Sequence, residues 1–439
     1  MCGIFGICSK NYISNILLIK ILTELKHRGS DSYGMSFIQN NTIVNIKLKN
    51  LLIENINYNI NTVITHNRYS TSKNKSINNF INQAQPITFK NNNIEFSLVH
   101  NGNISNIHKY INYNNNDYSD TQNIMKFFNN ITPNTFENKL IEFLNTVHCS
   151  YSIIILYNNN LYVIRDRYGY KPLILGQINN NYCVSSENCI KAFGTVRDIL
   201  PGEILKITEN NYTTIYHKQD KLQLKCIFEY IYFMNQNTDF NNHNVYHIRF
   251  NLGMNLAKNE QFNFIKNNTI VIGSPNTAIP MGKGYASYLN LNYIQLLKKN
   301  KNSVRTFILK DQETRINACK KFIVNSELIK NKIIILVDDS LVRGNTINSL
   351  SQMFHNAGCA ELHIRICSPE IKYPCYYGID IPTKEELIVN NYTIEEIEKK
   401  CNIDSLRYIS LETMINTFNN DTNFCTACFT GNHNKELDW

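Results

Sequence analysis

The chain has 439 residues, a formal net charge of +9 and 13 cysteines. Its length predicts two domains rather than one, and it has neither an apolar run near the ~18 residues of a membrane-spanning helix nor a secretory signal region, so we expect a soluble cytoplasmic protein with no membrane partner. Its basic residues are dispersed and its cysteines are numerous, which argues against nucleic-acid binding and favours catalysis or metal binding over a disulfide framework.

The chain begins "MCGIFGICSK", with Cys2 directly behind the initiator. Removal of Met1 would leave a thiol and a free α-amino group on one residue, and we expect maturation to need only this step. An α-amine has a pKa of about 7.7–8.0 and can therefore serve as the base for its own nucleophile. The plainer interpretation is a buried cysteine at the start of a strand.

Residues 1–210 contain mainly short β segments separated by turns. The stretch 150–166, "SYSIIILYNNNLYVIRD", predicts two strands around an Asn-rich reversal. Apolar residues at helical spacing predict a helix between Ile13 and Lys26, with Gly29 just beyond it. We expect a mixed α and β domain with much antiparallel sheet.

Short polar clusters interrupt these strands: "HRGSDSYGM" (27–35), "THNRYST" (65–71), "LVHNGNISN" (98–106) and "SDTQ" (119–122). Each alone is typical of a turn. Together with Cys2, "RDRYGYKPLILG" (165–176) and "SSEN" (185–188), they resemble the class II glutamine amidotransferase domain. The resemblance implies an N-terminal nucleophile fold, an αββα sandwich.

The resemblance also implies roles for five residues. Cys2 would attack the amide carbon of glutamine, and Asn101 with the Gly102 N–H would form the oxyanion hole. Arg68 would pair with the glutamine α-carboxylate, and Asp120 would receive the α-ammonium. The plainer alternatives are a turn asparagine, a surface arginine and an aspartate that caps the following helix.

The chain departs from the usual motifs of this domain at four positions. Ser30 replaces a glutamine and Arg167 replaces a proline, while Tyr170 and Lys171 replace an Ile-Arg pair. These changes affect loop details rather than the chemistry.

The stretch 330–358, "KNKIIILVDDSLVRGNTINSLSQMFHNAG", predicts a buried parallel strand, a polar loop and an amphipathic helix that stops at Gly358. Free N–H groups at a helix N-terminus bind anions, and adjacent carboxylates at a strand end suit ribose hydroxyls or a metal-bridged sugar. An ordinary turn with solvated aspartates is the alternative.

The core of that stretch, "LVDDSLVRGNT" (336–346), resembles the phosphoribosyl pyrophosphate motif of type I phosphoribosyltransferases, which implies an α/β domain with a parallel sheet. Asp338 and Asp339 would hold the ribose hydroxyls and Mg²⁺. The 5′-phosphate would be held by Ser340, Arg343, Gly344, Asn345 and Thr346.

An earlier segment, "GSPNTAIPMGKGYAS" (273–287), occupies the place of a second motif of that family. Thr277 retains an oxygen that could reach the metal. Asn276 stands where the family has an aspartate, so one carboxylate is missing.

The segment "LKKNKNSVRTFI" (297–308) resembles the lid that closes over the substrate of these enzymes. Lys299 and Arg305 would be pyrophosphate ligands. Lys301 and Val304 replace the usual arginine and glycine, which puts the flexibility of the lid in doubt.

Four scattered cysteines, Cys226, Cys375, Cys425 and Cys428, suit zinc or an iron–sulfur cluster, and their spacing does not choose between the two. Their contexts resemble the cluster-bearing subtype of the glutamine phosphoribosylpyrophosphate amidotransferase family. That resemblance implies a structural 4Fe–4S cluster that joins the domains to the C-terminal tail.

The resemblance now covers nearly the whole chain and implies domains 1–225 (glutaminase) and 226–410 (phosphoribosyltransferase), with a tail at 411–439. Ammonia from glutamine would pass through an internal channel and displace pyrophosphate from the sugar, giving 5-phosphoribosylamine in the first committed step of purine synthesis. The family implies a homotetramer or homodimer inhibited by purine nucleotides.

Two other functions compete with this one. A class II amidotransferase of the glucosamine-phosphate or asparagine synthetase type would lack "LVDDSLVRGNT". A non-catalytic regulator that binds phosphoribosyl pyrophosphate is suggested by Asn276 and the altered lid. The glutaminase residues Cys2, Arg68, Asn101 and Asp120 argue against a regulator.

Overall fold

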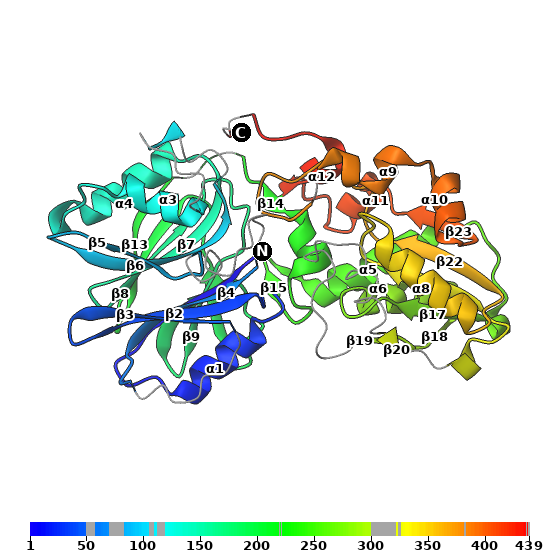
Figure 1. The fold of residues 1–439 in the computed structure, drawn as a ribbon, viewed down its shortest axis with the longest axis horizontal. Coiled ribbons are helices and arrows are strands. Elements are labelled where there is room, and N and C mark those ends of the chain that lie inside the picture. Colours follow the sequence, from blue (N-terminus) through cyan, green and yellow to red (C-terminus); the bar gives the residue numbers. More distant parts are fainter. Residues whose placement is uncertain are drawn as a thin grey trace.

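The computed structural model describes residues 1–49, 58–69, 83–104, 109–111, 119–218, 220, 222–299, 322–323, 326–381, 383–435 and 437. The chain forms two lobes, and its N-terminus lies between them (Figure 1). Within the described ranges, the helices are all too short or too polar to traverse a lipid bilayer.

The first lobe contains two antiparallel sheets. The seven-stranded sheet has the order β11-β9-β10-β1-β4-β2-β3, and the six-stranded sheet has the order β13-β12-β8-β7-β6-β5. The strands are β1 (Gly3–Cys8), β2 (Ser32–Gln39), β3 (Thr42–Leu48), β4 (Thr62–Arg68), β5 (Ile87–Lys90), β6 (Glu95–Asn103), β7 (Ser150–Tyr157), β8 (Asn160–Arg165), β9 (Ile174–Ile178), β10 (Asn181–Ser185), β11 (Gly194–Asp198), β12 (Glu203–Ile207) and β13 (Tyr212–His217). The hairpin expected in 150–166 is β7–β8.

Helices cover the outer faces of both sheets. Helix α1 (Asn15–Glu24) lies where a helix was predicted, and its Leu18, Ile21 and Leu22 pack on the seven-stranded sheet. Helices α3 (Asp120–Phe127) and α4 (Phe136–Thr146) pack on the six-stranded sheet, and the short 3₁₀ turn η2 (Pro133–Thr135) lies between them in the chain. A separate apolar core fills the space between the sheets. These layers form the predicted αββα sandwich.

The second lobe contains a five-stranded parallel sheet of order β18-β17-β21-β22-β23. Its strands are β17 (Thr269–Gly273), β18 (Asn292–Tyr293), β21 (Ile333–Asp338), β22 (Glu361–Ile366) and β23 (Ser405–Tyr408). Helices α5 (Val245–Lys258) and α6 (Ile279–Leu289) pack on one face, and α8 (Asn345–Asn356) and α10 (Ile394–Cys401) on the other. The central strand β21 is buried on both faces, as its continuous apolar sequence predicts.

The remaining short elements lie in the segment between the lobes, within the second lobe and in the tail. They are β14 (Lys225–Cys226), the π-helix η3 (Glu229–Phe233), β15 (Asp239–Phe240), β16 (His243–Asn244), η4 (Lys266–Asn268), β19 (Lys298–Lys299), β20 (Phe322–Ile323), η6 (Ser326–Leu328), η7 (Lys384–Glu386), α9 (Ile388–Asn391), α11 (Leu411–Asn416), β24 (Phe424–Cys425) and α12 (Ala427–Thr430). Strand β14 pairs in parallel with β24. One apolar core includes Met1 from the first lobe, α5 from the second and Phe429 from the tail, so all three parts meet beside the N-terminus (Figure 1).

Candidate functional site

Cys2 lies between the two sheets of the first lobe, immediately before β1. Its backbone N donates to Asn101 Oδ1 at 3.1 Å, although the two residues are far apart in the chain. Its thiol lies 3.8 Å from the carbonyl oxygen of Tyr69, which accepts from it. Cys2 therefore directly precedes strand β1, but it is only partly buried, unlike the buried cysteine of the plainer interpretation. Its backbone N contacts Asn101 in β6, and its thiol contacts the backbone directly after β4.

Two donors beside Cys2 suit an oxyanion. Asn101 is fully buried, and its Nδ2 makes no hydrogen bond within the described part of the chain. The next residue is Gly102, where a Cβ would lie 2.1 Å from the carbonyl oxygen of Ser150, so the chain needs glycine there. An unpaired buried donor costs free energy, and an anionic ligand at this point would remove that cost.

Arg68 and Asp120 lie on the same side of the site. Burial lowers the pKa of Arg68, while the nearby Cys2, Asp31 and Asp120 act in the opposite direction. The Asp120 carboxylate accepts from the backbone N–H of Ile104 at 3.2 Å. The structure thus brings Cys2, Arg68 and Asp120 together, as the motif predicts.

The alternative in which Asp120 caps the helix is wrong. Ser119 is the cap residue of α3: its Oγ accepts from Gln122 N at 3.3 Å, and its own N donates to Gln122 Oε1 at 2.9 Å. This reciprocal capping box satisfies the helix end and places Asp120 at the first helical position. The Asp120 carboxylate accepts from Ile104 N and, at 2.7 Å, from Thr121 N, and it faces His100.

His100 and Gln85 also lie next to this group, although the sequence motifs assigned them no role. Gln85 Oε1 accepts from His100 N at 2.6 Å, and Gln85 Nε2 donates to Thr121 Oγ1 at 3.0 Å. His100 Nδ1 lies 3.7 Å from Asp120 Oδ2, and burial lowers the pKa of His100. A polar residue directly before Asn101 in a buried strand was the available signal.

Arg28 is a third residue to which the sequence motifs assigned no role. Its Nε donates to the carbonyl oxygen of Cys2 at 2.9 Å, and its guanidinium pairs with Glu229, from Nη2 to Oε1 at 2.9 Å, and also with Glu187. All three charged side chains are buried. Burial alone would lower the pKa of Arg28, but the two carboxylates outweigh it and raise the pKa.

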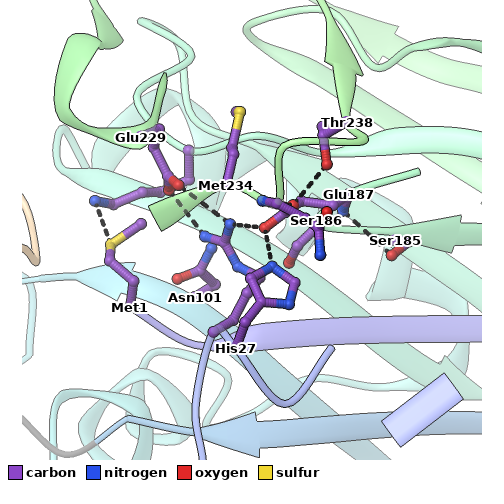
Figure 2. Close-up of polar contacts among 12 residues, drawn as sticks. Met1, His27, Asn101, Ser185, Ser186, Glu187, Glu229, Met234 and Thr238 are labelled. Atoms are coloured by element: carbon purple, nitrogen blue, oxygen red, sulfur yellow. Dashed lines mark hydrogen bonds and ion pairs between the residues drawn. The ribbon is translucent and has the colours of Figure 1, made fainter. Parts of the chain in front are cut away.

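Glu187 connects this cluster to the segment that enters the second lobe. It receives hydrogen bonds from Thr238 Oγ1 and Asn235 N, both at 2.7 Å, and lies 2.9 Å from His27 Nε2. Figure 2 shows Glu187 between His27 and Thr238. Polar motifs of the first lobe thus hold the connecting segment against Cys2.

The carboxyl end of β21 carries the two predicted aspartates, Asp338 and Asp339, both buried. Thr277 Oγ1 and Ser340 Oγ donate to the Asp339 carboxylate, the latter at 2.5 Å. Burial and the neighbouring carboxylate raise the pKa of Asp338. The pair therefore favours a bound cation, and the oxygen of Thr277 lies beside it, whereas Asn276 is exposed.

Helix α8 begins directly after this pair. Gly344 is its cap residue, has a φ of 79° and has no side chain to accept from the first-turn N–H groups of the helix. A Cβ at Gly344 would lie 2.6 Å from Ile388 Cδ1. This backbone suits a phosphate. The Arg343 side chain donates instead to Glu386 Oε2 at 2.8 Å.

Most of the predicted lid (297–308) lies outside the residues that the structure describes. Lys299 ends β19, and its side chain is not among the described ones. Lys301, Val304 and Arg305 lie outside the described residues.

The four predicted cysteines meet at the junction of the lobes and the tail. Cys226 in β14 is the register partner of Cys425 in β24, and Cys428 lies in α12. Cys375 Sγ accepts from Tyr377 N at 3.3 Å. All four are free thiols. Burial raises the pKa of Cys226 to about 12, and Cys428 interacts electrostatically with the other three thiols.

Two family models match separate parts of the chain. A glutamine amidotransferase domain matches residues 72–193, and a phosphoribosyl transferase domain matches residues 243–369. With Cys2 between the sheets of the first lobe and the Asp338–Asp339 pair before α8 in the second, these matches define the class: enzymes that join a glutamine amidotransferase to a phosphoribosyltransferase.

Full-length relatives identify the family. The chain is 32% identical to the amidophosphoribosyltransferase of Methanothermobacter thermautotrophicus, over 99% of the chain and 95% of the relative. It is 29% identical to the human amidophosphoribosyltransferase, over 100% of the chain and 98% of the relative. The chain belongs to the amidophosphoribosyltransferase family.

Two solved structures share the whole fold. The Bacillus subtilis glutamine phosphoribosylpyrophosphate amidotransferase, complexed with ADP and GMP, has a TM-score of 0.85 and 28% identity, covering 98% of this chain and 97% of its own. A structure described as the allosteric regulatory enzyme of purine biosynthesis has a TM-score of 0.87 and 28% identity, covering 98% and 96%. The arrangement of both lobes is thus that of the family.

Proposed function

We propose that this chain makes 5-phosphoribosylamine, glutamate and pyrophosphate from glutamine, water and phosphoribosyl pyrophosphate, the first committed step of purine synthesis. Glutamine would be hydrolysed in the first lobe and its ammonia used in the second, after passage through the interior. The observation that carries the proposal is the unpaired Asn101 Nδ2 beside Cys2, in a chain that also places two aspartates next to a free helix N-terminus.

In the first half-reaction the Cys2 thiol attacks the amide carbon of glutamine. Removal of Met1 turns the backbone N of Cys2 into an amine, and Asn101 Oδ1, already 3.1 Å from that nitrogen, holds it as the base. Asn101 Nδ2 and the Gly102 N–H then stabilise the negative oxygen of the tetrahedral intermediate. Arg68 pairs with the α-carboxylate of glutamine, and Asp120 pairs with its α-ammonium.

In the second half-reaction Asp338 and Asp339 bind the ribose hydroxyls and Mg²⁺, with the Thr277 hydroxyl beside them. When bound, Mg²⁺ neutralises charge on the pyrophosphate leaving group. Ser340 and the backbone of Arg343, Gly344, Asn345 and Thr346 hold the 5′-phosphate, as the free N–H groups of α8 support. Lys299 and Arg305 would bind the pyrophosphate.

We also propose that Cys226, Cys375, Cys425 and Cys428 hold a 4Fe–4S cluster. The sulfurs of a Cys₄ zinc site lie about 4 Å apart, because each Zn–S bond is about 2.3 Å long. Among the described residues, only His27, Glu187 and Cys189 form a group whose potential ligand atoms all lie within 4.8 Å of one another. The wider spacing of the four cysteines suits a cluster, in which each thiolate binds a different iron.

Several coarser properties follow the family in this proposal. The domains are 1–225 and 226–410, with the tail at 411–439, in keeping with the two family-model matches. The enzyme is a cytoplasmic homotetramer or homodimer. Purine nucleotides inhibit it, a role suggested by the ADP and GMP in the Bacillus subtilis complex.

The test is pyrophosphate release with glutamine or ammonia as the nitrogen donor. Cys2→Ala should abolish the glutamine-dependent reaction and retain the ammonia-dependent one, whereas Asp338→Asn should abolish both. Wild-type protein that binds phosphoribosyl pyrophosphate but turns over with neither donor would instead be a regulator.

A further inference from the structure

Lys171 places a buried positive charge beside the N-terminus. Its side chain is fully buried, and its Nζ donates to Met1 Sδ at 2.9 Å. Within the described ranges no carboxylate lies at ion-pair distance from this Nζ, whereas the buried Arg28 and Arg365 each pair with a glutamate. A thioether is a weak acceptor, and a buried charge without a counter-ion is costly. This cost indicates that the charge has a function beyond packing.

Loss of Met1 during maturation removes the hydrogen-bond partner of Lys171. Met1 is 2% exposed and packs with Tyr69 in the core where the lobes meet. The backbone of Lys171 is held independently of Met1, because its carbonyl oxygen accepts from Arg165 Nε at 2.9 Å and from Ser152 Oγ at 3.4 Å. In the mature protein Lys171 Nζ therefore faces the space that Met1 occupied.

The new α-amino group of Cys2 borders the same space. The covalent path from Met1 Sδ to Cys2 N spans at most about 6 Å, so Lys171 Nζ lies within about 9 Å of that nitrogen. The lysine charge also reaches β6, where Asn101 binds Cys2 N. Burial lowers the pKa of the preceding residue, His100, and Lys171 adds to that lowering, whereas Asp120 opposes it.

The elements packed around Cys2 contribute other titratable or charged groups. They are His66 and Arg68 of β4, His100 of β6, Asp120 of α3, Arg28 with Glu187 and Glu229, Asp31, and Cys375. Burial lowers the pKa values of both histidines, which are therefore neutral near pH 7. All these groups remain in a Lys171 variant, so such a variant isolates the effect of one charge.

We propose that Lys171 keeps the α-amino group of mature Cys2 unprotonated at neutral pH and so maintains it as the base of the glutaminase. A like charge at this distance disfavours the ammonium form, and solvent screens a buried lysine only weakly. Only the neutral amine can take the proton of the Cys2 thiol as the sulfur bonds to the amide carbon of glutamine. Lys171 acts through the amine and is thus a positioning residue. The inference rests on the glutaminase mechanism proposed above.

The experiment uses full-length protein whose loss of Met1 is verified by mass, and compares wild type with Lys171→Met, Lys171→Gln and Lys171→Arg. Lys206→Met is the control, because Lys206 lies in the same lobe but is 30% exposed and pairs with Glu137 at 3.0 Å. The kcat/KM for glutamine hydrolysis is measured between about pH 5.5 and 9, because its acid limb reports the base of the free enzyme. Ammonia-dependent synthesis shows that each variant is folded.

We expect the acid limb of the wild type to lie below the ordinary α-amine pKa of about 7.7–8.0. Lys171→Met and Lys171→Gln should move this limb to higher pH by about one unit, whereas Lys171→Arg and Lys206→Met should leave it in place. A wild-type limb at the ordinary value, an unchanged limb in the neutral variants, or an equal displacement in Lys171→Arg would overturn the role of Lys171 while leaving the glutaminase established. Wild type that hydrolyses no glutamine, or Cys2→Ala that still hydrolyses it, would overturn the proposed mechanism itself and with it this inference.

Discussion

The guanidinium of Arg28 donates from Nε to the carbonyl oxygen of Cys2 at 2.9 Å, so a buried cation holds the backbone of Cys2. The same guanidinium pairs with Glu229, which begins the π-helix leading into the second lobe. A change in that helix would therefore move a group that contacts Cys2 directly.

Loss of the Arg28 charge should destabilise the protein strongly. Arg28→Met leaves Glu187 and Glu229 buried without their cation, and such a break costs about 3–5 kcal/mol. The control is Lys139→Met, which removes an ion pair to Glu142 whose two side chains are 24% and 52% exposed. That change should cost less than about 1 kcal/mol. Urea unfolding of the two variants checks both; equal midpoints would show that the buried cluster adds nothing.

Removal of the oxyanion donor should affect only one of the two activities. Asn101→Ala should lower kcat with glutamine by about 10²–10³-fold, because the lost Nδ2 acts on the transition state. Synthesis with ammonia should continue. Asn103→Ala, two residues along β6, is the control, because Asn103 Nδ2 donates to the Tyr376 carbonyl oxygen at 2.8 Å, away from the thiol. A similar loss in both variants would contradict the assignment.

The sequence predicted those parts of the fold and site that have local patterns. The β7–β8 hairpin and β21 were found because apolar runs between turn residues are visible in a short window. The pairing of β14 with β24 was not predicted. Strands of two residues are too short to show alternation of apolar and polar residues, and Cys226 and Cys425 are distant in the chain.

The cluster of buried charged residues also could not be predicted from local sequence patterns. Arg28 and Glu187 stood in recognised motifs but received no role, and Glu229 lies in the apolar run "CIFEYIYF". Their contact joins residues from distant segments, and only the packed lobes bring them together. Asp120 was also given a helix-cap alternative, because Ser119 and Asp120 are both good cap residues and only the hydrogen bonds distinguish them.

Alanine substitutions at Gly344 and Gly358 allow an effect on phosphoribosyl pyrophosphate binding to be distinguished from an effect on stability. Gly344 and Gly358 both have a φ of 79°. A Cβ at Gly344 would lie 2.6 Å from Ile388 Cδ1, whereas at Gly358 the nearest atom would be 3.6 Å away. Each alanine variant should lose about 1–2 kcal/mol of stability from the left-handed backbone. Only Gly344→Ala should raise the KM for phosphoribosyl pyrophosphate, by about tenfold or more. Equal KM values would argue against a phosphate at α8.

Asp166 should make stability depend on pH in the acid range. Burial raises its pKa to about 6, against an ordinary 3.8. The folded protein therefore holds this proton more tightly than the unfolded chain, so the stabilising effect of protonation is full below about pH 4 and lost as pH rises through about 6. The difference is about 3 kcal/mol. Asp166→Asn should lack this slope. Denaturation of both proteins at pH 4.5 and 7 measures it, and parallel curves would refute the raised pKa.

Met1 should be absent from the active glutaminase. In the full chain Met1 is 2% exposed, and the nitrogen that would become the catalytic amine is still an amide, which cannot act as a base. Intact-mass analysis of active enzyme should show the loss of one methionine. Protein produced while the methionine aminopeptidase is inhibited should retain Met1, lose glutamine-dependent synthesis and keep ammonia-dependent synthesis. Full glutaminase activity in that preparation would exclude the α-amino group of Cys2 as the base.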